Sequence, residues 1–333
     1  MRISIVGAGA IGGLLGHRLA ASGHSVSLVA RGAHLRSIQE HGLTLIHESG
    51  ESETIRIPAA DQIGSGPFDA IVLGMKAHQV ADAAPAVGAA ISDSTVVVTA
   101  QNGIPWWYFI KHGGPHDGQR LESVDPEGRI AAHLPADRII GSVVYPAAEI
   151  GAPGVIKHIE GNRFSLGEID GADTPRVRAL SDALSGAGFK APVVSDIRAD
   201  IWLKLWGNLT FNPVSALTHA TLEDICRYLP TRALATSMMH EAQTVAEHLG
   251  IRFRLSLERR IAGAEAVGAH KTSMLQDVEA GRPLEVEALI GSVAELGRIT
   301  GIATPHIDAV YAATGLLNTT LAKAHGVLKL QAR

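Results

Sequence analysis

The sequence predicts an α/β nucleotide-binding domain followed by an all-α domain. The first observation behind this prediction is a glycine-rich turn, Gly7 to Gly12, between a short β-branched run and an apolar helical segment. The second is a change of pattern near Ser195-Asp196, beyond which strand signals stop and helix signals continue. We therefore expect a Rossmann-like domain over residues 1–195 and an all-α domain over residues 196–333.

Composition narrows the class of protein. The chain has 333 residues, of which 46% are hydrophobic and 19% charged, and its net charge is -4. Without a basic excess, neither nucleic acid nor a membrane surface is expected as a partner. The single cysteine, Cys226, excludes an intramolecular disulfide and a cysteine-based zinc cage, so no metal is expected. One cysteine and the lack of an apolar run of roughly 18 residues favour a cytoplasmic protein.

The glycine-rich turn lies in a predicted βαβ unit. A strand over 2–6 precedes it, a helix to about Ala21 follows, and a second strand covers 25–30. In G-x-G-x-x-G the first glycine permits the tight turn, the second lets backbone approach a pyrophosphate, and the third packs helix against strand. The predicted cofactor-binding run is Gly7, Ala8, Gly9, Ala10, Ile11 and Gly12.

The end of the second strand selects the cofactor. An NAD site carries Asp or Glu there, to bind the ribose 2′-hydroxyl. Here the strand ends Val29-Ala30-Arg31, and the Arg31 guanidinium can bind a 2′-phosphate. NADP(H) is therefore the predicted cofactor, and a solvated surface arginine is the alternative.

Polar residues follow the next two predicted strands. The apolar runs 69–75 and 95–100 are typical of strands buried on both faces. Lys76 and Asn102 come just after these runs, at the strand ends where open α/β sheets bind ligands. Both are candidates for the nicotinamide and substrate cleft, with an exposed lysine and an Asn-Gly turn as the alternatives.

The rest of the first domain contains an irregular segment and a closing set of elements. Residues 106–135 begin with four aromatic residues and become polar and glycine-rich, and we expect a lid-like insertion or hairpin with a type I turn at Asp125 to Gly128. The aromatic residues would cover the cleft or form an oligomer contact. The predicted strands and helix that follow cover residues 139–145, 154–159, 163–167, 175–187 (helix) and 191–194.

A striped helix opens the second domain. Lys204, Asn208 and Asn212 recur every four residues, so a helix places one amine and two amides on one face. Bulky apolar residues surround this stripe, and Pro213 is expected to kink or end the helix. A structural helix with satisfied polar groups is the alternative to a catalytic one.

Later helices have recognisable ends. Thr221 with Asp224 forms a variant capping box, and Pro283 suits the first position of a helix. Glu285 would then lie in the first turn of that helix, where the dipole favours a carboxylate. Ser273 lies twelve residues before Glu285, in the run KTSMLQD.

Taken together, these residues resemble the ketopantoate reductase (2-dehydropantoate 2-reductase) family over nearly the whole chain. The motifs that carry the resemblance are GAGAIG at 7–12, Arg31, the K-x-x-Q of Lys76 and Gln79, QNG at 101–103, K-x-x-x-N-x-x-x-N-P at 204–213, and SMLQD at 273–277 followed by Glu285. The set is specific for the family, although no single motif is. The resemblance implies NADPH-dependent reduction of 2-dehydropantoate to pantoate, in pantothenate (coenzyme A) biosynthesis.

The resemblance also implies roles for individual residues. Lys204 would be the general acid that protonates the ketone oxygen, and Glu285 would bind near this lysine and the substrate hydroxyl. Lys76 would act at the cofactor and the cleft. The residues implied in substrate binding are Asn102, Asn208, Asn212 and Ser273.

Two positions depart from the family pattern. Leu222 and His270 stand where asparagine is typical, and the 106–135 insertion is absent from short members. A related NADPH-dependent reductase of a different keto acid is therefore one alternative, because lost hydrogen bonds to a substrate hydroxyl shift specificity strongly. A non-catalytic NADPH-binding sensor is another. The partner implied is a small-molecule keto acid, and a homodimer is left open.

Overall fold

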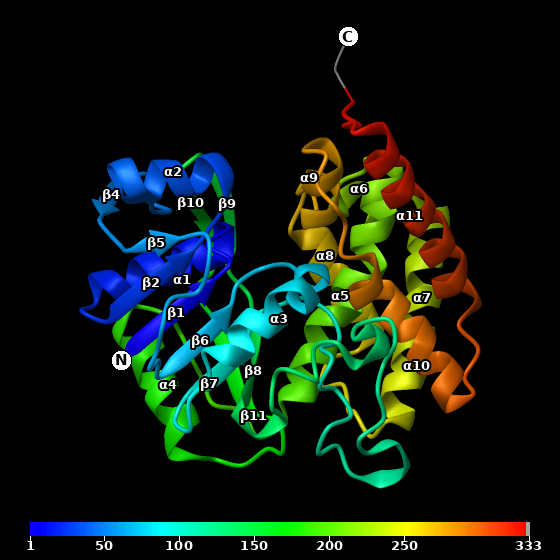
Figure 1. Cartoon of the computed structure of the whole chain (residues 1–333). Coiled ribbons are helices and arrows are strands. Elements are labelled where there is room, and N and C mark those ends of the chain that lie inside the picture. The colour runs from blue at the N-terminus through cyan, green and yellow to red at the C-terminus, as the bar shows by residue number, and fades with distance from the viewer. Residues whose placement is uncertain (331–333) are drawn as a thin grey trace. The chain divides into compact units, whose positions relative to one another are not determined.

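The computed structural model describes residues 1–330, and these form two compact units (Figure 1). The first unit comprises Met1–Gln101 and Pro105–Ile197. The second contains the chain from Arg198 onward together with the short segment Asn102–Ile104. The predicted fold class, a Rossmann-like α/β part followed by a helical part, is confirmed.

A seven-stranded sheet forms the centre of the first unit. Its strand order is β11-β8-β7-β6-β1-β2-β5, and every neighbouring pair is parallel except β11 with β8. All residues of β6, β7 and β8 are buried, as apolar strands covered on both faces should be. The strands are β1 (Arg2–Val6), β2 (Ser25–Val29), β5 (Ala59–Ala60), β6 (Ala70–Leu73), β7 (Val96–Thr99), β8 (Ile139–Val144) and β11 (Phe164–Glu168).

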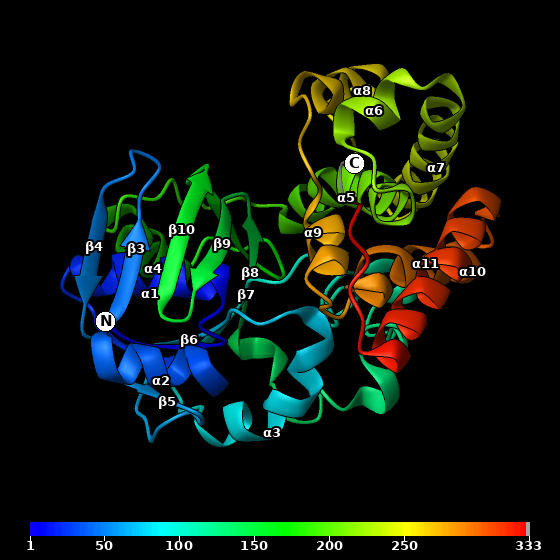
Figure 2. The same ribbon diagram turned by 90° about the horizontal axis from the view of Figure 1, so that it is seen from above.

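A second, four-stranded sheet packs on helix α1 (Ala10–Ala21), and the sequence patterns did not predict it as a separate sheet. Its order is β4-β3-β10-β9 (Figure 2). Helix α1 contacts strands of both sheets, which explains why most of it is buried although its apolar side chains show no clear one-sided stripe. The strands are β3 (Leu43–Ile46), β4 (Ser52–Ile55), β9 (Ala147–Ala152) and β10 (Val155–Glu160).

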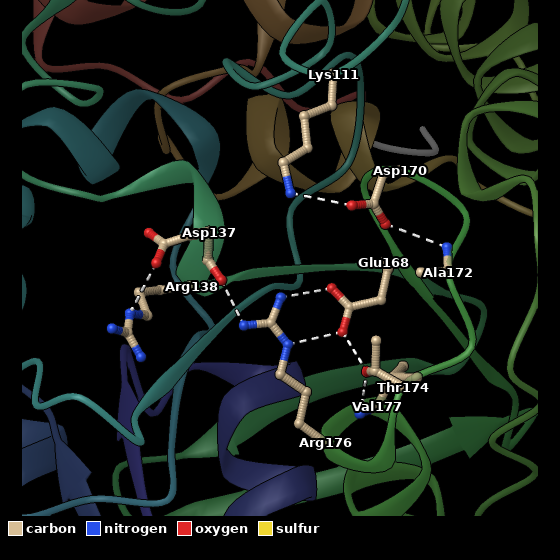
Figure 3. Close-up of polar contacts among 9 residues, drawn as sticks. All are labelled: Lys111, Asp137, Arg138, Glu168, Asp170, Ala172, Thr174, Arg176 and Val177. Atoms are coloured by element: carbon tan, nitrogen blue, oxygen red, sulfur yellow. Dashed lines mark hydrogen bonds and ion pairs between the residues drawn. The ribbon is translucent and has the colours of Figure 1, made fainter.

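Three further helices complete the first unit: α2 (Gly32–His41), α3 (Val80–Ala89) and α4 (Pro175–Gly186). A polar network connects the end of β11 to the start of α4 (Figure 3). Arg176 donates to both oxygens of the buried Glu168 carboxylate, at 2.7 and 2.6 Å. The N-cap residue of α4, Thr174, donates to the same carboxylate at 2.5 Å, and Lys111 pairs with Asp170 at 3.0 Å. The buried Glu168 carboxylate is therefore paired with a positive charge and hydrogen-bonded, as a buried charge requires.

The predicted hairpin within residues 106–135 is wrong. The segment contains turns and 3₁₀-helices but no strand, and Glu127 has a φ of 59°, which a type I turn does not allow. Its aromatic start is not exposed, since Trp107, Tyr108 and Phe109 are fully buried. Trp107 Nε1 also donates to Thr99 Oγ1 at 3.2 Å, which fixes the indole against β7.

The strand predicted near 191–194 is reduced to two isolated bridges, Arg163 to Lys190 and Leu166 to Val193. Pro192 accounts for this result. Its carbonyl accepts a hydrogen bond from the Leu166 amide, but proline has no N–H with which to extend the pairing.

The second unit is helical, with no strand among its described residues. Helix α5 packs on α7 through the Trp206 indole, which donates to the Met239 carbonyl at 2.8 Å. The capping box of Thr221 and Asp224 is confirmed at the start of α6. The helices are α5 (Ile197–Thr218), α6 (Leu222–Arg227), α7 (Leu229–His248), α8 (Leu257–Ala266), α9 (Ser273–Glu279), the π-helical turn Glu287–Gly291, α10 (Ser292–Thr300) and α11 (Pro305–Ala324).

Two helix boundaries differ from expectation. Helix α5 continues through Pro213 to Thr218, because proline removes only one backbone donor and the buried surroundings of α5 maintain the helix. No helix begins at Pro283: the next helical turn starts three to four residues later, so Glu285 precedes that turn instead of lying in it. Across residues 1–330, none of the helices has the length and apolar character that crossing a membrane requires.

Candidate active site

The glycine-rich turn joins β1 to α1 in the first unit. Gly7 has a φ of 98°, and a Cβ there would lie 2.6 Å from the backbone nitrogen of Met75. A Cβ on Gly12 would lie 2.1 Å from the Gly7 carbonyl oxygen, so the helix approaches the turn as closely as glycine permits. A Cβ on Gly9, the N-cap residue of α1, would meet no atom within 4 Å. The turn therefore leaves open space at the N-terminus of a twelve-residue helix, which fits a pyrophosphate.

Arg31 lies where β2 passes into α2. It is the exposed N-cap residue of α2 and follows Ala30, so this strand end carries a guanidinium and no carboxylate. The donor set fits a cofactor with a 2′-phosphate better than one with a free ribose hydroxyl.

The sequence patterns missed His34, which holds the glycine-rich turn. His34 Nε2 donates to the Ala8 carbonyl at 2.9 Å, and its Nδ1 accepts the Gly154 amide at 3.0 Å. This pairing requires a neutral ring that carries its proton on Nε2. Burial lowers the pKa of His34, although the bond to Ala8 opposes the shift, so the neutral form is favoured. A histidine three residues after Arg31 was the available signal, but nothing in the sequence indicated its partner Gly154.

The ends of β6 and β7 are held by glutamines. Gln79 Oε1 accepts the Lys76 amide at 3.2 Å, which gives the K-x-x-Q spacing a structural reason. Gln101 Nε2 donates to the carbonyls of Leu73 and Met75, at 2.6 and 3.2 Å. These bonds fix the loop that carries Lys76, so the loop has the rigidity that a binding site needs.

In the second unit, the structure brings Lys204 and Asn102 together. Lys204 Nζ donates to Asn102 Oδ1 at 2.6 Å. Burial lowers the pKa of Lys204 to about 8, while the negative charge of Glu285 opposes this shift. An amine with a pKa near working pH can both give and accept a proton, as a general acid requires.

The other predicted substrate residues lie on neighbouring elements of the second unit. Asn208 and Asn212 continue the stripe of Lys204 along α5, and Asn212 is buried. Ser273 is the first residue of α9, and its side chain is exposed. The cofactor candidates at the glycine-rich turn, Arg31 and Lys76 belong to the first unit, whereas Asn102, predicted for both roles, groups with the second.

Comparison with known proteins decides the family. The model described as "Ketopantoate reductase PanE/ApbA" matches residues 3–171, and its C-terminal counterpart matches residues 196–318. The chain belongs to the ketopantoate reductase family. The resemblance drawn from the sequence motifs is thereby confirmed, together with the NADP-dependent oxidoreductase class and the NADP(H) cofactor that it implied.

Relatives of this family, and a dehydrogenase of the same fold, match over nearly their whole length. A 2-dehydropantoate 2-reductase from Mesorhizobium japonicum is 53% identical over 313 residues, covering 94% of this chain and 96% of the relative. A crystal structure classed as a ketopantoate reductase, from Ralstonia solanacearum, has a TM-score of 0.91 at 40% identity and covers 96% of this chain and 98% of the other. A D-mandelate dehydrogenase solved with NADH and anilino(oxo)acetate has a TM-score of 0.82 at 24% identity, covering 97% and 99%, which shows a shared fold.

Proposed function

We propose that this chain reduces 2-dehydropantoate to pantoate at the expense of NADPH, with Lys204 as the general acid. The observation that carries the assignment of Lys204 is its bond to Asn102 combined with a pKa lowered to about 8. Membership of the ketopantoate reductase family supplies the reaction class.

The two units divide the work in this proposal. The first unit binds NADPH through the glycine-rich turn, Arg31 and Lys76, and the second unit, to which Asn102 belongs, supplies the acid and substrate contacts. NADPH, when bound, provides the hydride. Lys204 gives its proton to the ketone oxygen, and its positive charge stabilises that oxygen as negative charge develops.

Neighbouring groups prepare Lys204 for this step. The Asn102 carbonyl fixes the direction of the amine without neutralising it, because an amide oxygen carries no formal charge. The Glu285 carboxylate favours the protonated amine and so keeps a proton available at neutral pH. Asn208, Asn212 and Ser273 offer hydrogen bonds for the hydroxyl and carboxylate of a hydroxylated keto acid.

The test is NADPH consumption, followed by absorbance, across a panel of keto acids. We expect 2-dehydropantoate to give the highest kcat/KM, and pantoate to be the product identified by mass spectrometry. Fast turnover of another keto acid with slow turnover of 2-dehydropantoate would overturn the substrate assignment. NADPH binding without oxidation by any keto acid would support the sensor alternative.

A specific observation keeps a different keto acid as the second candidate. Leu222 and His270, the two departures from the family pattern, lie side by side, because the Leu222 amide donates to the His270 carbonyl at 3.0 Å. The family resemblance implies amides that bind the substrate at these positions, so their replacement at two neighbouring positions favours a different substrate side chain. The panel should therefore include 2-keto acids with branched aliphatic and aromatic groups.

Oligomeric state and location remain predictions. Large apolar side chains exposed on the second unit, such as Leu229 and Leu316 with 76% and 69% of their surface accessible, are the candidates for a homodimer contact. Light scattering during size-exclusion chromatography would test it. The cytoplasmic prediction rests on the lone cysteine, Cys226, which is buried as a free thiol.

A further inference from the structure

The acceptor of the Lys204 bond sits on a short segment that is docked within the second unit. The amide of Ile104 donates to the carbonyl of Ala288 at 2.9 Å. Gly103 has a φ of 88°, and a Cβ there would lie 2.2 Å from the same carbonyl oxygen. The QNG motif therefore needs its glycine because Asn102–Ile104 lies directly on the backbone of Ala288.

The Ala288 carbonyl is available because it lies in the π-helical turn Glu287–Gly291. In an α-helix this carbonyl would accept the amide of Ser292, four residues later. Here the Ser292 amide bonds the carbonyl of Glu287 instead. Ala288 can then accept from the Ile104 amide, and it also accepts from the Ser292 hydroxyl at 2.8 Å. Single π-helical turns of this kind are frequent at functional sites.

Tyr311 on α11 fastens the π-helical turn. Its hydroxyl lies 3.0 and 2.8 Å from the two carboxylate oxygens of Glu287, the first residue of the turn. Burial and the Glu287 carboxylate raise the pKa of Tyr311 to about 12. The hydroxyl therefore stays protonated and donates its hydrogen bond to the Glu287 carboxylate. A Cβ on Gly291 would lie 2.4 Å from Glu287 Oε2 and 3.0 Å from the tyrosine ring, so glycine leaves the space that this contact occupies.

The same turn is connected to Glu285, whose charge acts on Lys204. Glu285 precedes it by two residues, and the Glu285 carbonyl accepts the Leu289 amide at 3.2 Å. The π-helical turn therefore adjoins both groups that act on Lys204. It contacts Gly103 and Ile104, which follow Asn102, and it closely follows Glu285 in the chain.

We propose that Tyr311 and Glu287 are positioning residues, which hold the π-helical turn in the geometry that presents Asn102 and Glu285 to Lys204. The inference rests on the proposed function of Lys204. Neither Tyr311 nor Glu287 is proposed to contact substrate or cofactor.

The test compares Tyr311→Phe and Glu287→Ala with Glu287→Gln, which keeps an acceptor oxygen, and with a matched control. Thr319→Val is the control, because Thr319 lies exposed on the same helix and bonds only within it, to the Gly315 carbonyl. We expect Tyr311→Phe and Glu287→Ala to lower kcat by about ten- to a hundredfold, the range for a misplaced catalytic group. The KM for NADPH should stay unchanged, Glu287→Gln should recover most of the turnover, and Thr319→Val should match the parent.

Hydrogen–deuterium exchange gives a readout that does not depend on turnover. The amide of Ile104 is protected by Ala288, so it should exchange faster in Tyr311→Phe than in Thr319→Val, while amides of α7 stay unchanged. If folded Tyr311→Phe retains parental kcat and parental exchange at Ile104, the positioning proposal is wrong. If the parent does not oxidise NADPH with any keto acid but the Ile104 amide still exchanges faster in Tyr311→Phe, the proposed function is wrong. Tyr311 would then still hold the π-helical turn against Ile104.

Discussion

The Nζ of Lys204 donates a hydrogen bond of 2.6 Å to the Oδ1 of Asn102, a residue 102 positions earlier in the chain. The bond joins the middle of α5 to the segment that follows β7, two places that no local pattern connects. It holds the amine in one direction but adds no charge, so the balance between burial and the Glu285 carboxylate sets the pKa of Lys204.

Replacing Lys204 removes the proposed proton donor. For Lys204→Ala we expect turnover to fall about 10²- to 10⁴-fold, the usual contribution of a general acid. NADPH affinity, measured by fluorescence titration, should persist because the proposed cofactor residues lie in the first unit. Lys323→Ala is the control, since Lys323 is exposed on α11 of the same unit. Undiminished turnover by a folded Lys204→Ala variant would rule out the assignment.

The pH dependence follows from the lowered pKa. Lys204 loses its proton near pH 8 instead of near its ordinary value of 10.5, and reduction needs the protonated form. We therefore expect kcat/KM for reduction to be level below pH 8 and to fall as pH rises through it. The reverse reaction, oxidation of pantoate, should rise over the same range because it needs the neutral amine. A reduction rate that stays level up to pH 10 would contradict the role of Lys204.

Changing Glu285 should shift the pH at which kcat/KM for reduction falls. The Glu285 charge raises the pKa of Lys204, so Glu285→Gln should lower that pKa further and shift the fall in kcat/KM below pH 8. Glu247→Gln, an exposed change on α7, should leave the profile in place. The two pH profiles, recorded from about pH 5.5 to 10, include the ordinary pKa of histidine and that of Lys204. They separate a charge effect from a general loss of activity. If kcat/KM falls at the same pH in Glu285→Gln and Glu247→Gln, Glu285 does not act on Lys204.

What the sequence could predict here depended on how local the signal was. The glycine-rich turn, Arg31 and the stripe on α5 are set by residues within one βαβ unit or one helix, so spacing alone placed them. His34 and the π-helical turn escaped because their partners, Gly154 and Ile104, are far away in the chain. Contacts between residues far apart in the chain produce no periodic pattern in the sequence.

Burial was also hard to predict from local patterns. Trp107 to Phe109 were expected to cover the cleft or an oligomer contact, and the structure shows that all three side chains are fully buried within the chain. Large aromatic residues contribute most to stability when they are fully buried, and a polar, glycine-rich continuation does not exclude this. Pro213 likewise failed to end α5, because tertiary packing outweighs the loss of one backbone bond.

Arg31 should decide the choice between NADPH and NADH. For Arg31→Ala we expect NADPH affinity to fall about ten- to a hundredfold, as for a lost charge-assisted hydrogen bond. NADH affinity should change little, because NADH has no 2′-phosphate. Arg36→Ala, an exposed change on the same helix, is the control. Equal losses of NADPH and NADH affinity would indicate that Arg31 supports the fold of the turn and does not read the phosphate.

His34 should act on cofactor binding without acting on chemistry. It connects the Ala8 carbonyl of the glycine-rich turn to the Gly154 amide, so His34→Ala frees the turn on one side. A net loss of about 0.5–1.5 kcal/mol per hydrogen bond predicts NADPH affinity weakened by about two- to tenfold for each bond. The turnover number at saturating NADPH should stay at the parental value, because Lys204 and Asn102 are untouched. His41→Ala, on an exposed site of the same helix, controls for loss of a surface imidazole. If calorimetric titration gives His34→Ala and His41→Ala the same NADPH affinity, the turn keeps its shape without His34.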